Sequence, residues 1–368
     1  MSYRIPLIKP FINDRVKELV DEVLDSGFLT EGPVTRQFEE SVASYIGVPH
    51  AIAFTSCTTG IETALRVAGI GAGDEVIVPD YTYPATANAV KIVGAVPVIV
   101  DVDPQTLLMD YDKMEEAVSA NTKAVIPVSL FGNPLDFDRL MMAKERYGLL
   151  IIEDAACALG SSFKGRKTGG WSDMTVFSFH PRKFITTGEG GMVTTQNAQW
   201  AEAMHQYKHF GMGKSVGREE MVFQDTGTNY KMSNLLAAVG LAQMEKIDDL
   251  LNERMLLAEN YRKLLHGNQK IRIPETTGNG MHSYQSFAVF VPDRDRVMRQ
   301  MRAEGIEVQI GTYALHQHPA FQQLGVRLRG QYPGSIRAWE ETLVLPMFHS
   351  MTSAGQTEVV QKLTLCVE

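Results

Sequence analysis

The sequence predicts an α/β fold, in which a large domain on a mostly parallel seven-stranded sheet precedes a smaller C-terminal α+β domain. Short apolar runs alternate with helical patterns over the first two-thirds of the chain, and the pattern changes near residue 229. A length of 368 residues is sufficient for two domains with a sizeable core. We place the large domain at residues 1–245 and the small domain at residues 246–368.

Seven apolar runs predict strands that are buried on both faces, because they are rich in Val and Ile and lack polar alternation. Helical segments separate most of these runs, and strands separated by helices form a mainly parallel sheet with helices on both sides. The predicted strands are 51–55, 76–78, 96–100, 124–128, 149–152, 175–179 and 192–195. Predicted helices between them include 59–67, 85–93 and 136–147.

The last third of the chain begins with one long helical pattern over residues 233–266, for which Ser233 is a suitable N-cap. A strand at 286–291, a helix near 295–304 and a strand at 307–310 follow, and the glycines of 330–334 predict a loop. This order of elements indicates a small α+β domain that is joined to the large one by a linking helix.

Composition and charge exclude several classes of protein. The net charge is −8, from 35 basic and 43 acidic side chains without a long run of either sign, so nucleic acid is not expected as a partner. Neither a signal peptide nor an apolar stretch of membrane-spanning length is apparent, and we expect a cytoplasmic protein without a membrane partner. No metal site or disulfide is expected from the widely spaced cysteines, Cys57, Cys157 and Cys366.

Lys183 lies in a turn between two predicted strands. An apolar run ends at Phe179, Pro181 forces a turn, and a Gly-rich segment at 188–191 leads into the next strand. Most loop lysines are simply solvated. A lysine that is fixed beside a pocket and a cofactor can instead form a Schiff base, and the local pattern alone does not decide between these interpretations.

Two other segments allow both a structural and a chemical interpretation. The apolar strand 149–152 is followed by Glu153 and Asp154, at the carboxyl end of a parallel strand, where ligands bind. Asp154 could hold a pyridine nitrogen in its protonated form, or it could cap a helix. The hydroxyl-rich residues after strand 51–55 could cap a helix in the same way, or form an anion site at its N-terminus.

In their order and combination, these segments resemble the DegT/DnrJ/EryC1/StrS family of nucleotide-sugar aminotransferases, which use pyridoxal 5′-phosphate (PLP) and have the fold type I architecture. The resemblance covers nearly the whole chain, and the spacing from Ser178 to Lys183 with the glycine turn after it is its most specific part. The other motifs are GFLTEGP at 27–33, GDEVIVP at 73–79, EDAA at 153–156, GEGG at 188–191 and NYKM at 229–232.

The resemblance implies a role for individual residues. Lys183 matches the Schiff-base lysine, which also moves protons, and Asp154 matches the carboxylate that pairs with the pyridine nitrogen. Tyr83 matches the aromatic residue that stacks on the ring, although an aromatic in this position could also fill the core. Asn229 matches an asparagine that reaches the phosphate from the neighbouring subunit, or it is a turn residue. The other residues that match phosphate contacts are Thr58, the backbone of Cys57, and Ser178.

Four positions depart from the commonest family pattern. Cys57 replaces a Gly in the phosphate-binding segment, and Cys157 replaces the Gln or His that contacts the phenolic oxygen of the cofactor. A thiol is a weaker hydrogen-bond partner than either of these side chains. Lys231 stands in place of a common Arg, and Ser129 in place of a common His.

The resemblance also implies the reaction. It is transfer of the amino group of L-glutamate to a nucleotide-linked keto sugar, such as a 4-keto-6-deoxy hexose, for polysaccharide or glycoconjugate synthesis by a homodimer with shared active sites. The sugar is expected near 27–33 and 311–316, with His316 as a candidate contact or an ordinary surface histidine. Candidate donors to the nucleotide phosphates are Arg327, Arg329 and Lys214.

Two alternatives remain at this point. One is another PLP reaction on a sugar, such as elimination, although a dehydratase branch of the family carries His at the position of Lys183. The other is a PLP-binding regulator without turnover. The residues do not choose the nucleotide, the sugar, or amination at its 3- or 4-position.

Overall fold

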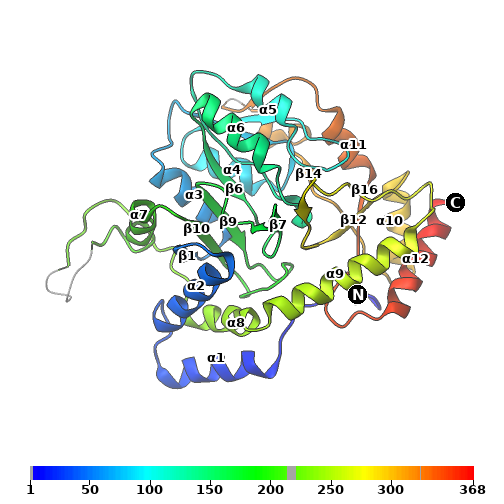
Figure 1. The fold of residues 1–368 in the computed structure, drawn as a ribbon, viewed down its shortest axis with the longest axis horizontal. Coiled ribbons are helices and arrows are strands. Elements are labelled where there is room, and N and C mark those ends of the chain that lie inside the picture. Colours follow the sequence, from blue (N-terminus) through cyan, green and yellow to red (C-terminus); the bar gives the residue numbers. More distant parts are fainter. Residues whose placement is uncertain (1–2, 214–220, 324) are drawn as a thin grey trace.

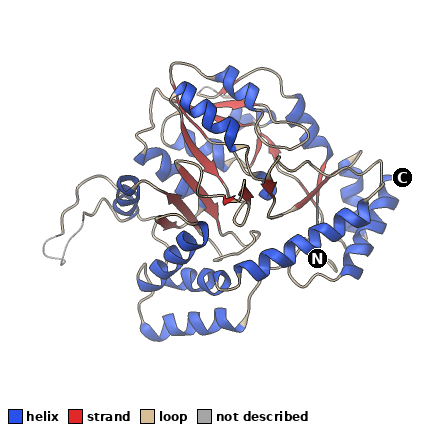
Figure 2. Cartoon of the chain, in the orientation of Figure 1, coloured by secondary structure: helices blue, strands red, loops and turns tan. Residues whose placement is uncertain are grey.

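A computed structural model describes residues 3–213, 221–323 and 325–368. Over these residues the chain forms a central eight-stranded sheet with helices on both faces (Figures 1 and 2). Across the sheet, the strands are β1 (His50–Phe54), β10 (Gly191–Thr195), β9 (Met174–Ser178), β6 (Leu150–Asp154), β5 (Thr122–Val125), β2 (Glu75–Pro79), β4 (Val96–Val100) and β15 (Arg327–Leu328).

The sheet is mostly parallel, as the sequence predicted. The six strands from β9 to β15 run parallel to their neighbours, and β10 runs antiparallel to both β1 and β9. All seven predicted apolar runs form strands of this sheet. The predicted count of seven was wrong by one, because Arg327–Leu328 adds a short edge strand beside β4. Both residues of that strand are exposed, so they have no buried apolar pattern that the sequence could reveal.

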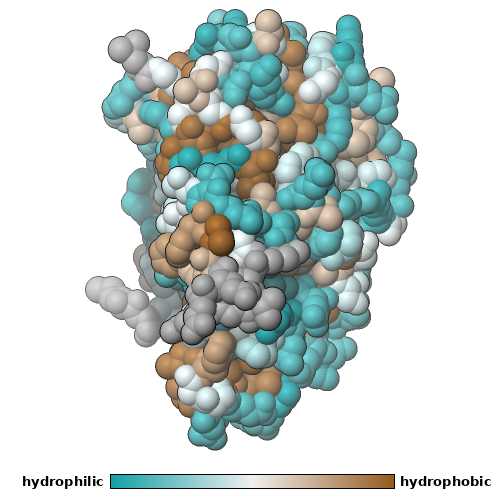
Figure 3. Space-filling model, turned by 90° about the vertical axis from the view of Figure 1, so that its left-hand side faces the viewer, coloured by the Kyte–Doolittle hydropathy of each residue, from teal (hydrophilic) through white to brown (hydrophobic). Residues whose placement is uncertain are grey.

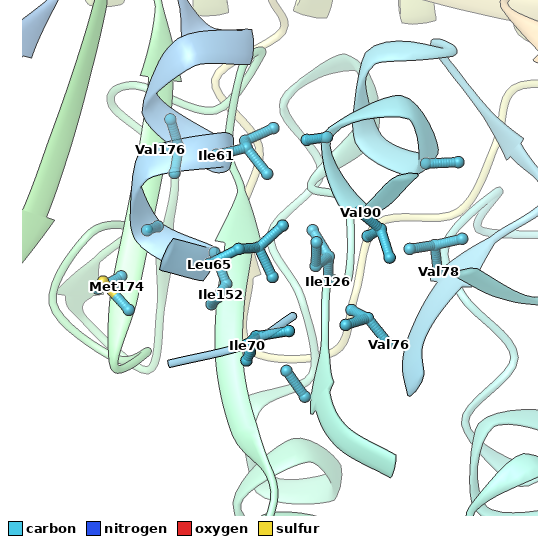
Figure 4. Close-up of a cluster of buried hydrophobic side chains, with 14 of the residues drawn as sticks. Ile61, Leu65, Ile70, Val76, Val78, Val90, Ile126, Ile152, Met174 and Val176 are labelled. Carbon is cyan, nitrogen blue, oxygen red and sulfur yellow. The ribbon is translucent and has the colours of Figure 1, made fainter. Parts of the chain in front are cut away.

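Side chains alternate between the two faces of the sheet, which explains why whole strands are apolar. Val76 and Val78 pack with Ile61 and Leu65 of α3 in one core cluster (Figure 4). Ile77, between them, belongs to a second cluster on the other face. The helices that contribute to these two clusters are α3 (Cys57–Val67), α4 (Ala85–Ile92), α5 (Tyr111–Ala117), α6 (Phe137–Tyr147), α7 (Ala198–Lys208) and α11 (Pro333–Glu341).

The C-terminal part contains a three-stranded antiparallel sheet in the order β12-β16-β13, with its own hydrophobic core. Ile5 contributes to that core, so the beginning of the chain packs with its end. These elements are β12 (Phe287–Phe290), β13 (Gln309–Ile310), β16 (Thr342–Leu345), α10 (Arg294–Ala303) and α12 (Ser353–Val367).

Two sequence-based expectations for this part were wrong. The long helix is two helices, α8 (Asn234–Met244), which Ser233 caps as predicted, and α9 (Ile247–Leu265). At Lys246, φ is −119° and ψ is 13°, so the backbone leaves the helical region, although the apolar pattern continues on both sides. The predicted loop at 330–334 ends early, because α11 (Pro333–Glu341) begins with a proline at its first position. The division after residue 245 falls in the break between α8 and α9, and the division into two domains remains a prediction.

Segments that are far apart in the sequence meet in two small sheets, where β3 pairs with β14 and β7 pairs with both β8 and β11. Among the described residues, no helix is long and apolar enough to cross a membrane. The bounds are α1 (Asp14–Ser26), α2 (Pro33–Ile46), β3 (Tyr81–Thr82), β7 (Ser162–Phe163), β8 (Arg166–Lys167), β11 (Gly280–Met281), β14 (Tyr313–Ala314), and the 3₁₀ turns Leu130–Gly132, Leu315–Gln317 and Pro319–Phe321.

Gly191 allows the closest approach between β10 and the start of α3. A Cβ atom at this position would lie 2.4 Å from the backbone carbonyl carbon and oxygen of Ser56, which cannot move aside like a side chain. We expect Gly191→Ala to lower the free energy of unfolding by about 1–3 kcal/mol, as measured by urea denaturation. Gly278→Ala is the control, because a Cβ atom there meets nothing within 4 Å. Equal stability of the two variants would contradict this prediction.

Candidate active site

The candidate site lies where strands β1, β6 and β9 end. These three strands point the same way, so their carboxyl ends lie at one edge of the sheet. The register places Phe54 and Ser178 on either side of Gly191. As a result, the start of α3, the carboxylate of Asp154 and the turn that carries Lys183 come together from distant parts of the sequence.

Lys183 follows β9 in a turn that is closed by the bond from its own N–H to the carbonyl of His180. Its Nζ lies 3.1 Å from Sγ of Cys157, in a partly buried position. Burial lowers the pKa of this lysine, but the interactions with Cys157, Cys57 and Asp154 outweigh that effect, and the net direction is upward. Lys183 is thus a fixed amine in a protected position, not a solvated loop lysine.

Asp154 ends strand β6 with its side chain only 5% exposed. Oδ1 accepts a hydrogen bond from the backbone N–H of Ala156 at 3.1 Å, and Oδ2 accepts one from the hydroxyl of Thr86 at 2.8 Å. Burial raises the pKa of this carboxyl group, while Thr86, Ala156 and Lys183 act in the opposite direction. In the part of the chain that the structure describes, no lysine or arginine forms an ion pair with Asp154.

Cys57 is the first residue of α3 and lies between these groups. Its Sγ is 4.0 Å from Oδ1 of Asp154 and 3.9 Å from the carbonyl oxygen of Val176. Burial raises the pKa of the Cys57 thiol well above its ordinary value, and Asp154 adds to that effect. We call Cys57, Asp154, Cys157 and Lys183 the lysine cluster.

The N-terminus of α3 adjoins the lysine cluster. Ser56 caps the helix, since its hydroxyl accepts from the N–H of Thr59, and Ser56 N–H donates in turn to the Thr59 side chain. The first intrahelical bond is donated by Gly60, so the N–H groups of Cys57 and Thr58 precede it and have no intrahelical acceptor. The helix dipole and these donors favour an anion at this point.

The structure places two other predicted residues apart from the lysine cluster. Tyr83 follows β3 and is 65% exposed, with its ring centroid 6.1 Å from that of Tyr313. Asn229 is exposed, and its Oδ1 accepts a hydrogen bond of 2.6 Å from Nζ of Lys231. Among the described contacts, none joins Asn229 to the lysine cluster of its own chain.

The residues predicted to contact the substrate lie at different places in the fold. His316 is held by Asp80, with 2.6 Å between Nδ1 and Oδ2, and its side chain is 16% exposed, so it is not an ordinary surface histidine. Arg327 pairs with Glu75 at the amino end of β2, the edge opposite to Asp154. Arg329 is exposed and lies closer to the carboxyl edge, and Lys214 lies outside the described residues.

Comparison with known proteins shows to which family this chain belongs. The model of the DegT/DnrJ/EryC1/StrS aminotransferase family matches residues 10–364. The chain belongs to this family. GDP-perosamine synthase from Caulobacter vibrioides is 38% identical over 328 residues, which cover 87% of this chain and 88% of that protein. The spore coat polysaccharide biosynthesis protein SpsC from Bacillus subtilis is 33% identical over 374 residues, covering 98% and 96%.

Solved structures agree with this assignment. Spr1654 from Streptococcus pneumoniae, which has been solved in PLP and PMP forms, superposes with a TM-score of 0.93 at 28% identity and 99% coverage of both chains. DesV from S. venezuelae gives a TM-score of 0.93 at 30% identity, covering 100% of this chain and 99% of that one. The expected fold type I is confirmed, and this member of the DegT/DnrJ/EryC1/StrS family is a PLP-dependent aminotransferase.

The site of this aminotransferase fits PLP in three independent respects. The start of α3 offers donors to a phosphate, and Lys183 offers an amine to an aldehyde. Asp154 is a buried carboxylate whose hydrogen-bond donors are a hydroxyl and a backbone N–H. Among the described residues it forms no ion pair, so its charge is available to a protonated ring nitrogen. The described residues contain no group of three or more His, Cys, Asp or Glu that could hold a metal ion.

Two residues of this region were given no role from the sequence alone. Thr86 hydrogen-bonds to Asp154, and its signal was a hydroxyl three residues after Tyr83, in the first turn of a predicted helix. Glu153, beside Asp154, is buried and accepts a 2.5 Å hydrogen bond from the hydroxyl of Ser129. Ser129, which stands at the position where His is common in the family, therefore donates a hydrogen bond to this second buried carboxyl group.

The contact with Cys157 gives a testable effect on the protonation of Lys183. Because Cys157 contributes to raising the pKa of Lys183 and burial lowers it, Cys157→Ala should lower this pKa. The neutral amine is the form that captures an aldehyde, so the pH profile of PLP capture by the cofactor-free protein should move to lower pH. Stopped-flow absorbance measures the capture rate. Cys366→Ala, in α12, should leave the profile in place, and an unchanged profile for Cys157→Ala would refute the assignment.

Proposed function

We propose that this aminotransferase moves the amino group of L-glutamate onto a nucleotide-linked keto sugar, such as a 4-keto-6-deoxy hexose, for polysaccharide or glycoconjugate synthesis. The observation that carries the proposal is the lysine cluster, where a fixed amine and a buried carboxylate without a cation partner meet beside a helix N-terminus. The names of two relatives, GDP-perosamine synthase and a spore coat polysaccharide biosynthesis protein, support the sugar substrate.

Two residues of the cluster, Lys183 and Asp154, have proposed tasks in the chemistry. When PLP is bound, Lys183 Nζ would hold it through the aldehyde carbon, with loss of water. Once the amino group of glutamate has displaced it, the free Nζ would take a proton from Cα of glutamate and deliver one to the sugar carbon that receives nitrogen. Asp154 Oδ1 or Oδ2 holds the proton on the ring nitrogen, and the bound cofactor then supplies the electron sink for the carbon–hydrogen bond that breaks. The buried position of Asp154 supports this task, because it strengthens the interaction of its charge with the ring.

The phosphate is proposed to bind at the start of α3. The backbone N–H groups of Cys57 and Thr58 and the hydroxyls of Thr58 and Ser178 are the proposed donors. This assignment is supported by the register that brings the ends of β1 and β9 to either side of Gly191. A side chain at Gly191 would collide with the backbone of Ser56 and Cys57. Glycine at this position therefore allows the start of α3 to lie where its N–H groups are proposed to bind the phosphate.

We also propose a homodimer in which Asn229 of one chain completes the phosphate site of the other. Asn229 is exposed in the single chain and is oriented by Lys231, which also lies over the ring of Phe210. Phe210 and Phe223 are 46% and 60% exposed. Figure 3 looks onto the face of the molecule from which the chain after α7 projects, and it shows apolar areas on that face. Exposed apolar surface of this kind is typical of a face that is covered by a partner.

The sugar is proposed to bind between the loop 27–33 and the segment 311–316. Glu31 of the loop is fixed by an ion pair of 3.0 Å with the buried Lys208. The other segment lies against Tyr83, because β14 pairs with β3 and Tyr313 contacts the Tyr83 ring. His316 remains a candidate contact, through the ring nitrogen that does not face Asp80.

A half-reaction tests the donor and the acceptor separately. We expect L-glutamate alone to bleach the visible absorbance of the lysine-bound cofactor, and the correct nucleotide-linked keto sugar to restore it. A panel of such sugars, scored by absorbance and by mass of the aminated product, identifies the acceptor.

The controls are two variants of the lysine cluster. Lys183→Ala should lose transfer while it still binds PLP without a covalent bond, and Asp154→Asn should fold but lose most activity. Normal PLP binding with no response to glutamate would favour a regulator instead. Restoration by free keto acids but by no sugar would contradict the sugar substrate, and release of an elimination product would indicate the other PLP reaction.

Mixed dimers test the shared site. Lys183→Ala and Asn229→Ala proteins should each be nearly inactive. In a mixed dimer, one site carries both changes and the other carries neither, so equal mixing should restore about a quarter of the wild-type activity. Activity is measured after subunit exchange, with heterodimers quantified by differently tagged chains. Heterodimers that form without recovery of activity would exclude the sharing of Asn229.

A further inference from the structure

Thr86 supplies the short side-chain hydrogen bond to Asp154. The distance from Thr86 Oγ1 to Asp154 Oδ2 is 2.8 Å, whereas the Cys57 thiol lies 4.0 Å from the other carboxylate oxygen. Thr86 is fully buried. Since Asp154 has no ion-pair partner among the described residues, the orientation of its carboxylate depends on Thr86 and on the backbone N–H of Ala156.

The direction of the bond follows from the neighbours of the Thr86 hydroxyl. Three oxygen atoms surround it, at 2.8 Å in Asp154, 3.1 Å in the Thr82 side chain and 3.3 Å in the Tyr83 carbonyl. A hydroxyl has one hydrogen to donate, and the charged oxygen is both the nearest and the strongest acceptor. Thr86 therefore donates to Asp154, and Thr82 can donate to Thr86.

Thr86 also holds the turn that carries Tyr83. Its backbone N–H donates to the Tyr83 carbonyl at 3.3 Å, in the first turn of α4. Thr82, on the other side of Tyr83, pairs with Tyr313 of β14. One buried threonine thus connects the two groups that are proposed to act on the pyridine ring, the carboxylate that would pair with its nitrogen and the aromatic side chain that would stack on it.

We propose that Thr86 is a positioning residue for the cofactor ring, which it serves by orienting the carboxylate of Asp154 and by fixing the turn of Tyr83. This inference rests on the proposed function, because it requires that these two residues hold the ring of PLP. Thr86 itself touches neither substrate nor reacting atoms in this scheme.

Binding of PLP to the cofactor-free protein tests the inference without reference to activity. Thr86→Val keeps the shape of the side chain and removes the donor, so we expect the dissociation constant for PLP to rise about tenfold or more. Thr86→Ser keeps the hydroxyl and should bind PLP within about threefold of wild type. Absorbance titration measures both constants, and thermal unfolding shows that the variants remain folded.

The pH dependence of binding separates positioning from general destabilisation. Burial raises the pKa of Asp154, and the hydrogen bond from Thr86 acts against that effect. Without this bond the pKa rises further, and Asp154 must be charged to hold the ring nitrogen. The affinity of Thr86→Val should therefore fall at a higher pH on the acid side than that of wild type, whereas Thr86→Ser should follow the wild-type profile.

Two other threonines provide matched controls. Thr194→Val removes a buried hydroxyl on β10 that donates to the carbonyl of Gly169 at 3.0 Å, and it should leave both the affinity and the profile unchanged. Thr82→Val leaves the bond from Thr86 to Asp154 intact and should have a smaller effect than Thr86→Val. If Thr86→Val does not fold, Thr86→Cys replaces it, because a thiol of similar size is a weak donor and should also weaken binding.

The outcomes distinguish this inference from the proposed function. If Thr86→Val binds PLP like Thr194→Val and keeps the wild-type pH profile, Thr86 is not a positioning residue, and the proposed function stands. If the wild-type protein binds no PLP, the proposed function and this inference both fail. If it binds PLP but glutamate leaves its absorbance unchanged, the proposed function fails, and the binding of PLP to the Thr86 variants still decides this inference.

Discussion

The burial of two opposite charges that do not pair with each other is the constraint on which the site depends. Asp154 and Lys183 both lose water, and burial of an ionised group costs several kcal/mol unless other interactions compensate. Here the compensation comes from the N–H of Ala156 and the hydroxyl of Thr86 on one side, and from the thiol of Cys157 on the other. These partners hold both groups in place and leave each of them free to meet a complementary charge or an aldehyde.

The topology of the sheet explains how such a site arises from distant segments. Strands β1, β6 and β9 all end at one edge, and β10 joins β1 to β9 in an unbroken antiparallel register. Gly191, on β10, lets the start of α3 approach the sheet, as no other residue could without moving the Ser56 backbone. The anion-binding helix end and the buried charges are therefore fixed by the same backbone arrangement, and not by flexible side chains.

The sequence predicted the parts of this arrangement that rest on apolar patterns and specific motifs. All seven buried strands were identifiable, because each is apolar on both faces, and the motifs around Asp154 and Lys183 identified the cluster. β15 was missed because its two residues are exposed, and the break at Lys246 because no Gly or Pro marks it. The hydroxyl of Thr86 was visible three residues after Tyr83, but its role could not be found, since its partner is 68 positions away and only the sheet brings them together.

Two of the departures from the commonest family pattern, Ser129 and Cys157, lie beside these buried charges. Burial raises the pKa of Glu153 to about 7, against the hydrogen bonds from Ser129, Thr175 and Ser172. A histidine at position 129 could carry a positive charge and would favour the ionised form of Glu153, whereas a serine stabilises the carboxyl group without adding charge. A partly neutral Glu153 reduces repulsion of the adjacent Asp154, which must be ionised in its proposed role. At Cys157 a thiol stands in place of Gln or His and lies 3.1 Å from the amine of Lys183, so this substitution adds a direct contact to the lysine.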